Sequence, residues 1–343
     1  MTTTDIIEVL VKIVAVFFIL LTGFAYLTLF ERRVLAALQS RIGPNRVGPG
    51  GFLQPVADGL KLLFKEDIIP AKADKFLYLL APVAVVVPVL LSAAIVPWGP
   101  TIQLFGRSIP LHLADINIGV LFFLGLGSLG VYGIVLAGWS SNNKYALIGG
   151  LRASSQMISY ELAMGLAALG VVMLSGSLSM VDIVNAQANG RWFIFMQPLG
   201  FMIFAITMVA ETKRAPFDLP EAEQELVAGF HTEYSGMKFA MFYLAEYIAM
   251  IVISAVAATL YLGGWRGPFV EQLPILGPLY LFLKIMVFLF IFVWLRASFP
   301  RLRYDRLMTV GWKILLPLAL INLVVTAIAV VGADTKFFGL LGG

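Results

Sequence analysis

The sequence predicts an all-α, polytopic membrane protein, and three observations carry this prediction. Of its 343 residues, 60% are hydrophobic and only 13% are charged, whereas a soluble domain is roughly 45–50% apolar and about 25% charged. The mean hydropathy is +0.91. Several apolar stretches are long enough for a helix of about 20 residues to cross a bilayer. We therefore expect residues 1–343 to form a single membrane domain.

About eight apolar stretches fit transmembrane helices. At 1.5 Å per residue, a helix of about 20 residues matches the ~30 Å hydrocarbon core of a bilayer. The expected spans lie near residues 6–30, 76–96, 116–138, 158–178, 192–211, 238–263, 275–297 and 312–332.

Arginine and lysine residues are distributed unevenly among the loops that connect these spans. Most of them follow the odd-numbered spans, in loops at about 31–75, 139–157, 212–237 and 298–311, which we number 1, 3, 5 and 7. The positive-inside rule places such loops in the cytoplasm. Both termini then lie on the outer side of a bacterial inner membrane. The net charge of +4 is explained by this loop bias, so nucleic acid is not an expected partner.

Loop 1 contains a segment with the pattern of an amphipathic helix. Phe52, Val56 and Leu60 recur at helical spacing, whereas Asp58 and Lys61 occupy another face. A helix with one apolar and one charged face lies in the membrane interface. We therefore expect an interfacial helix in loop 1.

Loop 5 is acidic and predicts a short helix. Asp218 and Glu221 are spaced as a helix N-cap and the acidic residue of a capping box, and Pro220 suits the first turn. The helix should continue to about Phe230. Because Glu221 and Glu225 are four residues apart, they share one of its faces.

Glutamates also lie in or at the ends of the expected spans. Glu161 opens the fourth span, Glu211 closes the fifth and Glu246 lies inside the sixth. A charge inside a bilayer costs about 2.5–3.5 kcal/mol on insertion scales, so such residues face a protein interior or water. One interpretation is a proton relay that includes Glu221 and Glu225. The alternative is structural, in which the loop glutamates interact with a helix dipole or stabilise assembly.

Two further features of the spans have more than one interpretation. Lys284, near the middle of the seventh span, fits proton transfer, pairing with a buried glutamate, or snorkelling to the interface. Gly125, Gly127 and Gly130 match a dinucleotide-binding pattern, but no strand precedes them. Close helix packing through small residues is the better interpretation.

The residue types that usually hold metals are scarce. Cysteine is absent, and the two histidines are His112 and His231. This excludes disulfides, thiolate zinc sites and cysteine-ligated iron–sulfur clusters within the chain. We therefore expect no metal site and no cofactor held by this chain alone.

Two long motifs stand out in the cytoplasmic loops. The first consists of ERRVLAALQSRIGPN at 31–45 and GFLQPVADGLK at 51–61. The second consists of ETKRAPFDLPE at 211–221, which continues through ELVAGF at 225–230. Both resemble signatures of the family of quinone-chamber membrane subunits of respiratory complex I, the NADH:quinone oxidoreductase. The resemblance covers essentially the whole chain.

The resemblance implies a function that composition alone does not. The family forms much of the tunnel through which quinone, the substrate, reaches an iron–sulfur cluster in a soluble-arm partner. Its carboxylates begin a proton path toward small membrane subunits and antiporter-like subunits, so quinone reduction is coupled to proton pumping. Flavin and iron–sulfur clusters lie in partner subunits, and the membrane supplies lipid contacts. This chain is thus expected to be a subunit of a proton-translocating enzyme and not catalytic alone.

Two groups of residues are assigned by matching the motifs. The quinone-chamber residues are Glu31, Arg32, Arg41, Asp58, Lys61, Arg214, Phe217, Asp218 and Phe230. The proton-path residues are Glu161, Glu211, Glu246, Glu221 and Glu225.

Other classes of protein remain as alternatives at this point. The membrane anchor of an energy-converting nickel–iron hydrogenase shares the fold implied by the resemblance but needs no quinone tunnel. A ferredoxin-fed quinone oxidoreductase would differ only in the electron donor. An independent ion transporter would purify as a functional unit without soluble partners.

Overall fold

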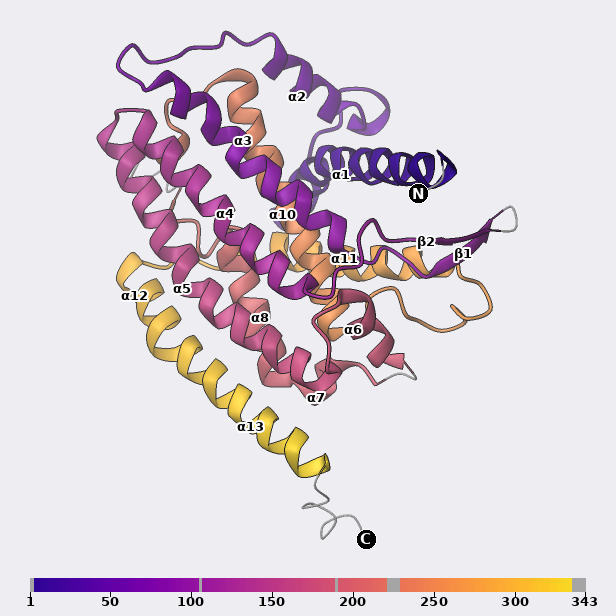
Figure 1. Cartoon of the computed structure of the whole chain (residues 1–343). Coiled ribbons are helices and arrows are strands. Elements are labelled where there is room, and N and C mark those ends of the chain that lie inside the picture. The colour runs from indigo at the N-terminus through magenta and orange to yellow at the C-terminus, as the bar shows by residue number, and fades with distance from the viewer. Residues whose placement is uncertain (1–2, 105–106, 189–190, 221–228, 335–343) are drawn as a thin grey trace.

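The computed structural model describes residues 3–104, 107–188, 191–220 and 229–334, and it confirms the predicted fold class. In this part of the chain, seven helices are long and apolar enough to span a membrane. They form an elongated bundle (Figure 1). The helices are α1 (Thr3–Leu38), α3 (Lys75–Ser92), α4 (Gly119–Ser140), α5 (Lys144–Ser175), α10 (Gly236–Tyr261), α11 (Leu276–Ser298) and the run of α12 (Tyr304–Thr309), π-helical η5 (Val310–Leu315) and α13 (Leu316–Asp334).

The expected span at 192–211 is not a single spanning helix in the structure. It consists of α7 (Phe193–Met196) and α8 (Pro198–Glu211), which are interrupted at Gln197. With 14 residues, α8 is about 21 Å long, which is less than a bilayer core. The interruption has a physical cause, since Pro198 has no N–H to donate. The side chain of Gln197 at the interruption contacts α13. It donates a hydrogen bond to Oγ1 of Thr326 at 2.5 Å and accepts one from Nδ2 of Asn322 at 2.8 Å.

Three other helical runs extend beyond their expected spans. The run of α12, η5 and α13 begins at Tyr304, within the segment expected as loop 7. Helix α1 continues through the first residues assigned to loop 1 and ends at Leu38. Most of the segment expected as loop 3, at 139–157, is helical because α5 already begins at Lys144. The side chain of Asn143 accepts a hydrogen bond from the backbone N–H of Tyr145 and so caps this helix. The connection between α4 and α5 is therefore a short turn.

Helix α10 lies at the centre of the bundle, packed against α1, α3, α8 and α11, while α13 packs against α5 at the edge (Figure 1). Helices α3, α4 and α5 pack side by side at close range. A Cβ atom at Gly133 would lie 2.5 Å from Cγ2 of Val85, and one at Gly138 would lie 2.5 Å from the carbonyl oxygen of Ala146. Small residues thus allow this close approach.

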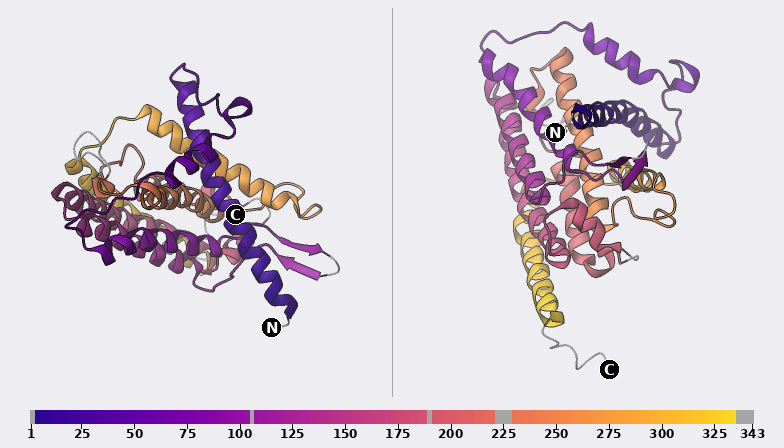
Figure 2. Two further views of the ribbon diagram at one scale, coloured as in Figure 1. Left: turned by 90° about the horizontal axis from the view of Figure 1, so that it is seen from above. Right: turned by 45° about the vertical axis from the view of Figure 1, so that its right-hand side comes forward.

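The two ends of the bundle carry different small elements. At one end, loop 1 contains η1 (Pro49–Gly51) and α2 (Gln54–Leu63), the expected amphipathic helix. This end also holds the turn after α8 and η4 (Gly229–His231), whereas the expected acidic helix lies largely at 221–228, outside the described residues. At the other end are η2 (Ala93–Ile95), the antiparallel hairpin β1 (Thr101–Leu104) and β2 (Arg107–Pro110), and α6 (Met180–Ala186). Helix α1 crosses the bundle obliquely between the two ends (Figure 2).

Candidate functional site

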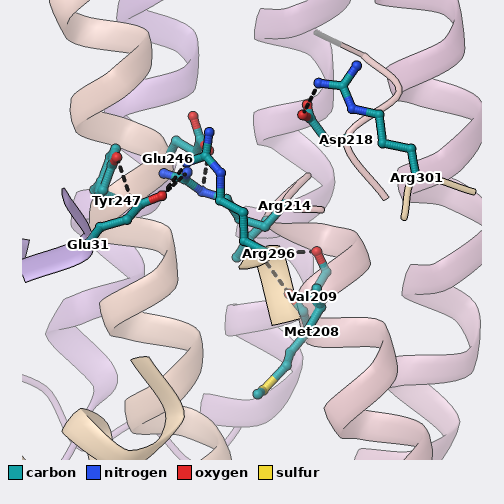
Figure 3. Close-up of polar contacts among 10 residues, drawn as sticks. Glu31, Met208, Val209, Arg214, Asp218, Glu246, Tyr247, Arg296 and Arg301 are labelled. Carbon is teal, nitrogen blue, oxygen red and sulfur yellow. Dashed lines mark hydrogen bonds and ion pairs between the residues drawn. The ribbon is translucent and has the colours of Figure 1, made fainter. Parts of the chain in front are cut away.

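A buried network of charged side chains connects three helices to the turn after α8. Glu31 of α1 is 3% exposed. One of its oxygens, Oε1, lies 3.2 Å from Nη1 of Arg214 and also accepts a hydrogen bond from Arg296 of α11. The other, Oε2, accepts a hydrogen bond from the hydroxyl of Tyr247 at 2.7 Å. Figure 3 shows these side chains pointing toward one another.

Arg214 is the central residue of this network. Its Nε lies 2.7 Å from Oε1 of Glu246, and its guanidinium lies over the Tyr247 ring at 4.4 Å from the centroid. Burial lowers the pKa of Arg214, but the carboxylates of Glu246 and Glu31 more than offset this effect. The pKa of the guanidinium therefore lies well above its usual value, and the side chain stays charged. With the partly exposed Arg296, two cations balance the two carboxylates of Glu31 and Glu246, which are buried or nearly so.

The turn that carries Arg214 is held in place by a side chain from α5. Nε2 of Gln156 is buried and donates to the carbonyl oxygens of Ala210 and Phe217, each at 2.8 Å. The N–H of Phe217 donates to the carbonyl of Arg214 at 2.8 Å. These bonds satisfy carbonyl groups at and just beyond the end of α8, which lack partners in the helix itself. They therefore fix the direction in which Arg214 leaves the helix.

A second group of acidic side chains meets at α4. The hydroxyl of Ser128 donates a hydrogen bond to Oε1 of Glu161. A Cβ atom at Gly127 would lie 3.7 Å from Oε1 of Glu211 and 3.8 Å from Oε1 of Glu161. The two carboxylates thus face the same point of the α4 backbone. Oε2 of Glu211 is buried and accepts no hydrogen bond from the residues that the structure describes.

A cavity lies between Glu211 of the second group and Glu246 of the first. Its volume is about 90 Å³, and it is lined by Glu211, Glu246 and Gly127, together with Lys213 and apolar side chains. At Gly125 and Gly130 a Cβ atom would meet no atom within 4 Å. The expectation of close packing at these glycines is therefore wrong, and Gly130 instead lines the cavity. A mainly apolar cavity of this volume that contains a few polar groups can hold water near the carboxylates of Glu211 and Glu246.

The described aromatic and acidic residues expected in loop 5 make contacts of their own, outside the Glu31 network. Oδ2 of Asp218 accepts a hydrogen bond from Nη2 of Arg301 at 2.9 Å, at a distance from the Glu31 network (Figure 3). Burial raises the pKa of Asp218 above its usual value, and Arg301 partly offsets this effect. The buried ring of Phe217 packs edge-on against Tyr160 with centroids 5.3 Å apart. Phe230 stacks on His231.

His231 lies in an aromatic stack. Its ring lies 4.9 Å from the ring of Phe230 and 5.3 Å from that of Phe239, measured between centroids. Burial, together with the charge of Lys213, lowers the pKa of His231 to about 4. The imidazole is therefore neutral at physiological pH.

The loop 1 residues form a separate, more exposed group. Nη1 of Arg32 lies 2.6 Å from Oδ2 of Asp58, and Nζ of Lys61 lies 3.9 Å from Oδ1 of the same residue. The first pair attaches α2 to the end of α1, and the second lies within α2. Arg41 is exposed, and its Nε donates to Oε1 of Gln39 at 2.8 Å. Glu221 and Glu225 lie outside the described residues.

Three residues of these groups are absent from the sequence-based assignment. Arg296 and Tyr247 bind Glu31, and Ser128 binds Glu161. A signal for Arg296 does exist in the sequence. A carboxylate at the membrane end of a span needs a cation, and Arg296 lies at the matching end of the seventh expected span.

In the structure, Lys284 binds backbone carbonyl groups. Its Nζ donates to the carbonyl oxygens of Leu262, Gly264 and Arg266, each at 2.7 Å. All three donors of the ammonium group are thus used. The side chain caps the end of α10, where carbonyl groups lack partners within the helix. It is not paired with a buried glutamate as one of the sequence-based interpretations expected.

Comparison with known proteins gives a family match and many close relatives. A family model described as NADH dehydrogenase matches residues 11–327. One of the H subunits of NADH-quinone oxidoreductase in Geobacter metallireducens is 55% identical over 322 residues, covering 94% of this chain and 96% of the relative. The H subunit of NADH-quinone oxidoreductase from Thermomicrobium roseum is 56% identical over 319 residues, covering 90% of this chain and 92% of the relative.

Proposed function

The chain belongs to the NADH dehydrogenase family as a membrane subunit of NADH-quinone oxidoreductase, and from this identity we propose that it forms the quinone-access chamber and the start of the proton path. The single observation that carries the proposal is the pair of contacts made by Arg214. This residue contacts Glu31 on α1 and Glu246 on α10, and Glu246 also lines the cavity that reaches Glu211. A charge change near Glu31 is thereby linked to the carboxylates of the cavity.

The quinone chamber lies beside the loop 1 end of α1 in this proposal. A quinone has an apolar tail and two carbonyl oxygens, so its site needs apolar walls and a few placed polar groups. Helices α1, α2 and α10 supply the walls. Arg32 and Asp58 are paired at the rim, and exposed Arg41 follows α1. Arg41 thus has donors available for a quinone carbonyl or a partner subunit.

The proton path follows the cavity. Reduction of a quinone to a quinol takes up two electrons and two protons, and a partner subunit with the terminal iron–sulfur cluster supplies the electrons. The uptake changes the charge near Glu31 and Arg214, and charges interact more strongly in a low-dielectric interior than in water. Protons then pass among Glu246, Glu211 and Glu161. Loop 5 transmits the change, since it lies between Glu211 and Glu246 in the chain.

The proposal also specifies partners and orientation. The soluble arm binds at the end that holds loop 1 and the turn after α8, and this end faces the cytoplasm. Small membrane subunits and antiporter-like subunits receive the protons, and flavin and iron–sulfur clusters remain in partner subunits. The relatives' names specify NADH and quinone, which supports this assignment over a hydrogenase anchor or a ferredoxin-fed enzyme.

Isosteric loss of charge tests the proton path in the assembled complex. Glu246→Gln and Glu211→Gln keep the shape of the side chain but remove its titratable group. In reconstituted vesicles, each should lower the proton-to-electron ratio or quinone reductase activity. Glu233→Gln is the matched control. Glu233 lies between Glu211 and Glu246 in the chain, but it lines another pocket and accepts a hydrogen bond from Nδ2 of Asn143. Wild-type ratios and activity in both cavity variants would refute the path, and loss of assembly without a coupling defect would favour a structural role.

A further inference from the structure

A second, almost entirely apolar groove lies between α1 and α11 at the hairpin end of the bundle. It contains about 340 Å³ of space, and Trp98 and His112 line it together with side chains of both helices. Each helix contributes side chains spaced by four and then three positions, which places them on a single helical face. These side chains are Lys12, Val16 and Ile19 on α1 and Pro278, Phe282 and Ile285 on α11.

The groove is open along the side where α1 leaves the bundle. Ile19 is 58% exposed and Phe282 is 55% exposed. Helix α1 is the least buried of the seven spanning helices in the described chain. Its groove-lining segment from Lys12 to Ile19 is about 10 Å long at 1.5 Å per residue. An apolar opening of this kind on a spanning helix faces the hydrocarbon of the membrane.

One ion pair lies beside the groove. Lys12 lines the groove, and its Nζ lies 2.6 Å from Oε1 of Glu8, one helical turn nearer the start of α1; the two side chains are 17% and 30% exposed. Burial lowers the pKa of His112, and the charge of Lys12 acts in the same direction, with partial compensation by Asp115. The imidazole is therefore neutral at physiological pH and offers hydrogen bonds without charge. Trp98 adds an indole, the residue type that is enriched at membrane–water interfaces.

We propose that this groove binds a membrane glycerophospholipid, with one acyl chain between α1 and α11 and the headgroup at Lys12, Glu8 and His112. Charge complementarity carries the choice of occupant. A phosphate fits the Lys12 ammonium and the His112 imidazole, and a headgroup amine fits the Glu8 carboxylate. The apolar walls bury the acyl chain, which is stabilised by about 0.8 kcal/mol per buried CH₂ group. The bound lipid fixes the position of the loosely packed N-terminal half of α1.

Photo-crosslinking in the complete complex tests this site. The probe is phosphatidylethanolamine with a diazirine in one acyl chain, incorporated into the membranes from which the complex is purified. After irradiation, labelled peptides are identified by mass spectrometry, and retained phospholipid is measured as phosphorus per complex. We expect labelling of the peptides that contain Ile19 and Phe282.

Matched variants separate the groove from the rest of the helix. Val16→Trp fills the groove and should reduce labelling about tenfold, which corresponds to roughly 1.4 kcal/mol of binding free energy. Val14→Trp is the control, because Val14 is 66% exposed and does not line the groove. Ala15→Phe fills the same groove from an exposed position and provides a second test in case Val16→Trp impairs assembly.

The headgroup contacts have their own test. Lys12→Gln leaves the walls intact and should lower the amount of phospholipid retained through purification. Equal labelling in wild type, Val16→Trp and Ala15→Phe would overturn the proposal. So would crosslinks from the groove to a helix of another subunit, or preferential labelling of the groove by a photoactivatable quinone.

Discussion

Glu31 and Arg214 are 183 positions apart in the chain, yet Oε1 of Glu31 lies 3.2 Å from Nη1 of Arg214 in a buried site. The contact joins α1, which leads into loop 1, to the turn that begins loop 5. Glu246 and Arg296 complete the site, so that two carboxylates and two guanidinium groups balance one another. The two loops assigned to the quinone chamber therefore meet at one charge network.

Removal of the central cation should destabilise the protein strongly. Arg214→Met keeps the apolar stem but leaves Glu246 without its cation, and breaking a buried pair in this way costs about 3–5 kcal/mol. The double variant Arg214→Met/Glu246→Leu removes both charges and should recover part of this loss. Thermal unfolding of the purified complex measures both effects.

An exposed arginine provides the control for this experiment. The Arg303 side chain is 86% exposed and its Nε lies 3.4 Å from Oδ1 of Asp305. Surface pairs contribute about 0–1 kcal/mol, so Arg303→Met should leave the melting temperature almost unchanged. A double variant less stable than Arg214→Met would contradict the pairing with Glu246.

A side chain at Gly127 should separate the carboxylates of Glu211 and Glu161, which both face this residue. Gly127→Val places methyl groups near Oε1 of both Glu211 and Glu161, where space is limited. We expect a lower proton-to-electron ratio in reconstituted vesicles, with NADH oxidation by an artificial acceptor retained. Gly125→Val in the same helix is the control, because a Cβ atom there meets no atom within 4 Å. Equal ratios in the two variants would argue against the role of this position.

Loss of the exposed arginine in loop 1 should separate two electron-transfer activities. Arg41→Ala removes a charged donor, and a hydrogen bond to a charged group contributes about 1.5–3 kcal/mol, so quinone reduction should fall about tenfold or more. Reduction of a soluble artificial acceptor by NADH should remain, because that acceptor takes electrons upstream. Lys72→Ala removes another exposed cation of loop 1 and serves as the control. A parallel fall of both activities in a fully assembled complex would contradict the assignment of Arg41.

His231 should make the stability of loop 5 depend on pH in a defined window. The pKa of His231 is about 4 in the folded protein, compared with the usual 6.5. Between these values the unfolded chain binds a proton that the folded chain excludes, so stability falls as the pH decreases from about 6.5 to about 4. The full decrease in the free energy of unfolding is on the order of 3 kcal/mol. His231→Phe, which suits the aromatic stack, should remove this dependence when melting is compared at pH 5 and pH 7. The same slope in variant and wild type would show that other groups cause it.

Labelling of single cysteines should determine the orientation of the chain, which contains no native cysteine. Ser40 and Ser298 lie at the loop 1 end and are exposed, whereas Ser108 lies in the hairpin at the opposite end. An impermeant thiol reagent applied to intact cells should label Ser108→Cys but not Ser40→Cys or Ser298→Cys. Labelling of Ser40→Cys or Ser298→Cys from outside the cell would contradict the proposed topology.

Local patterns were sufficient for much of the architecture. Hydropathy and periodicity are properties of neighbouring residues, so they located the seven long helices and the amphipathic helix α2. They did not locate the interruption at Gln197, since the residues on either side of it are apolar. Its polar partners, Asn322 and Thr326, come from α13, more than a hundred positions away.

The positions of Glu161, Glu211 and Glu246 in or at the ends of apolar spans follow from the local composition, which also sets the cost of their charge in a bilayer. Their arrangement relative to one another depends on the packing of the helices. The tertiary structure pairs Glu246 with Arg214, places Glu211 and Glu161 at the backbone of Gly127, and directs Lys284 to three carbonyl groups. Such contacts join residues far apart in the chain, and helix packing determines which of them meet.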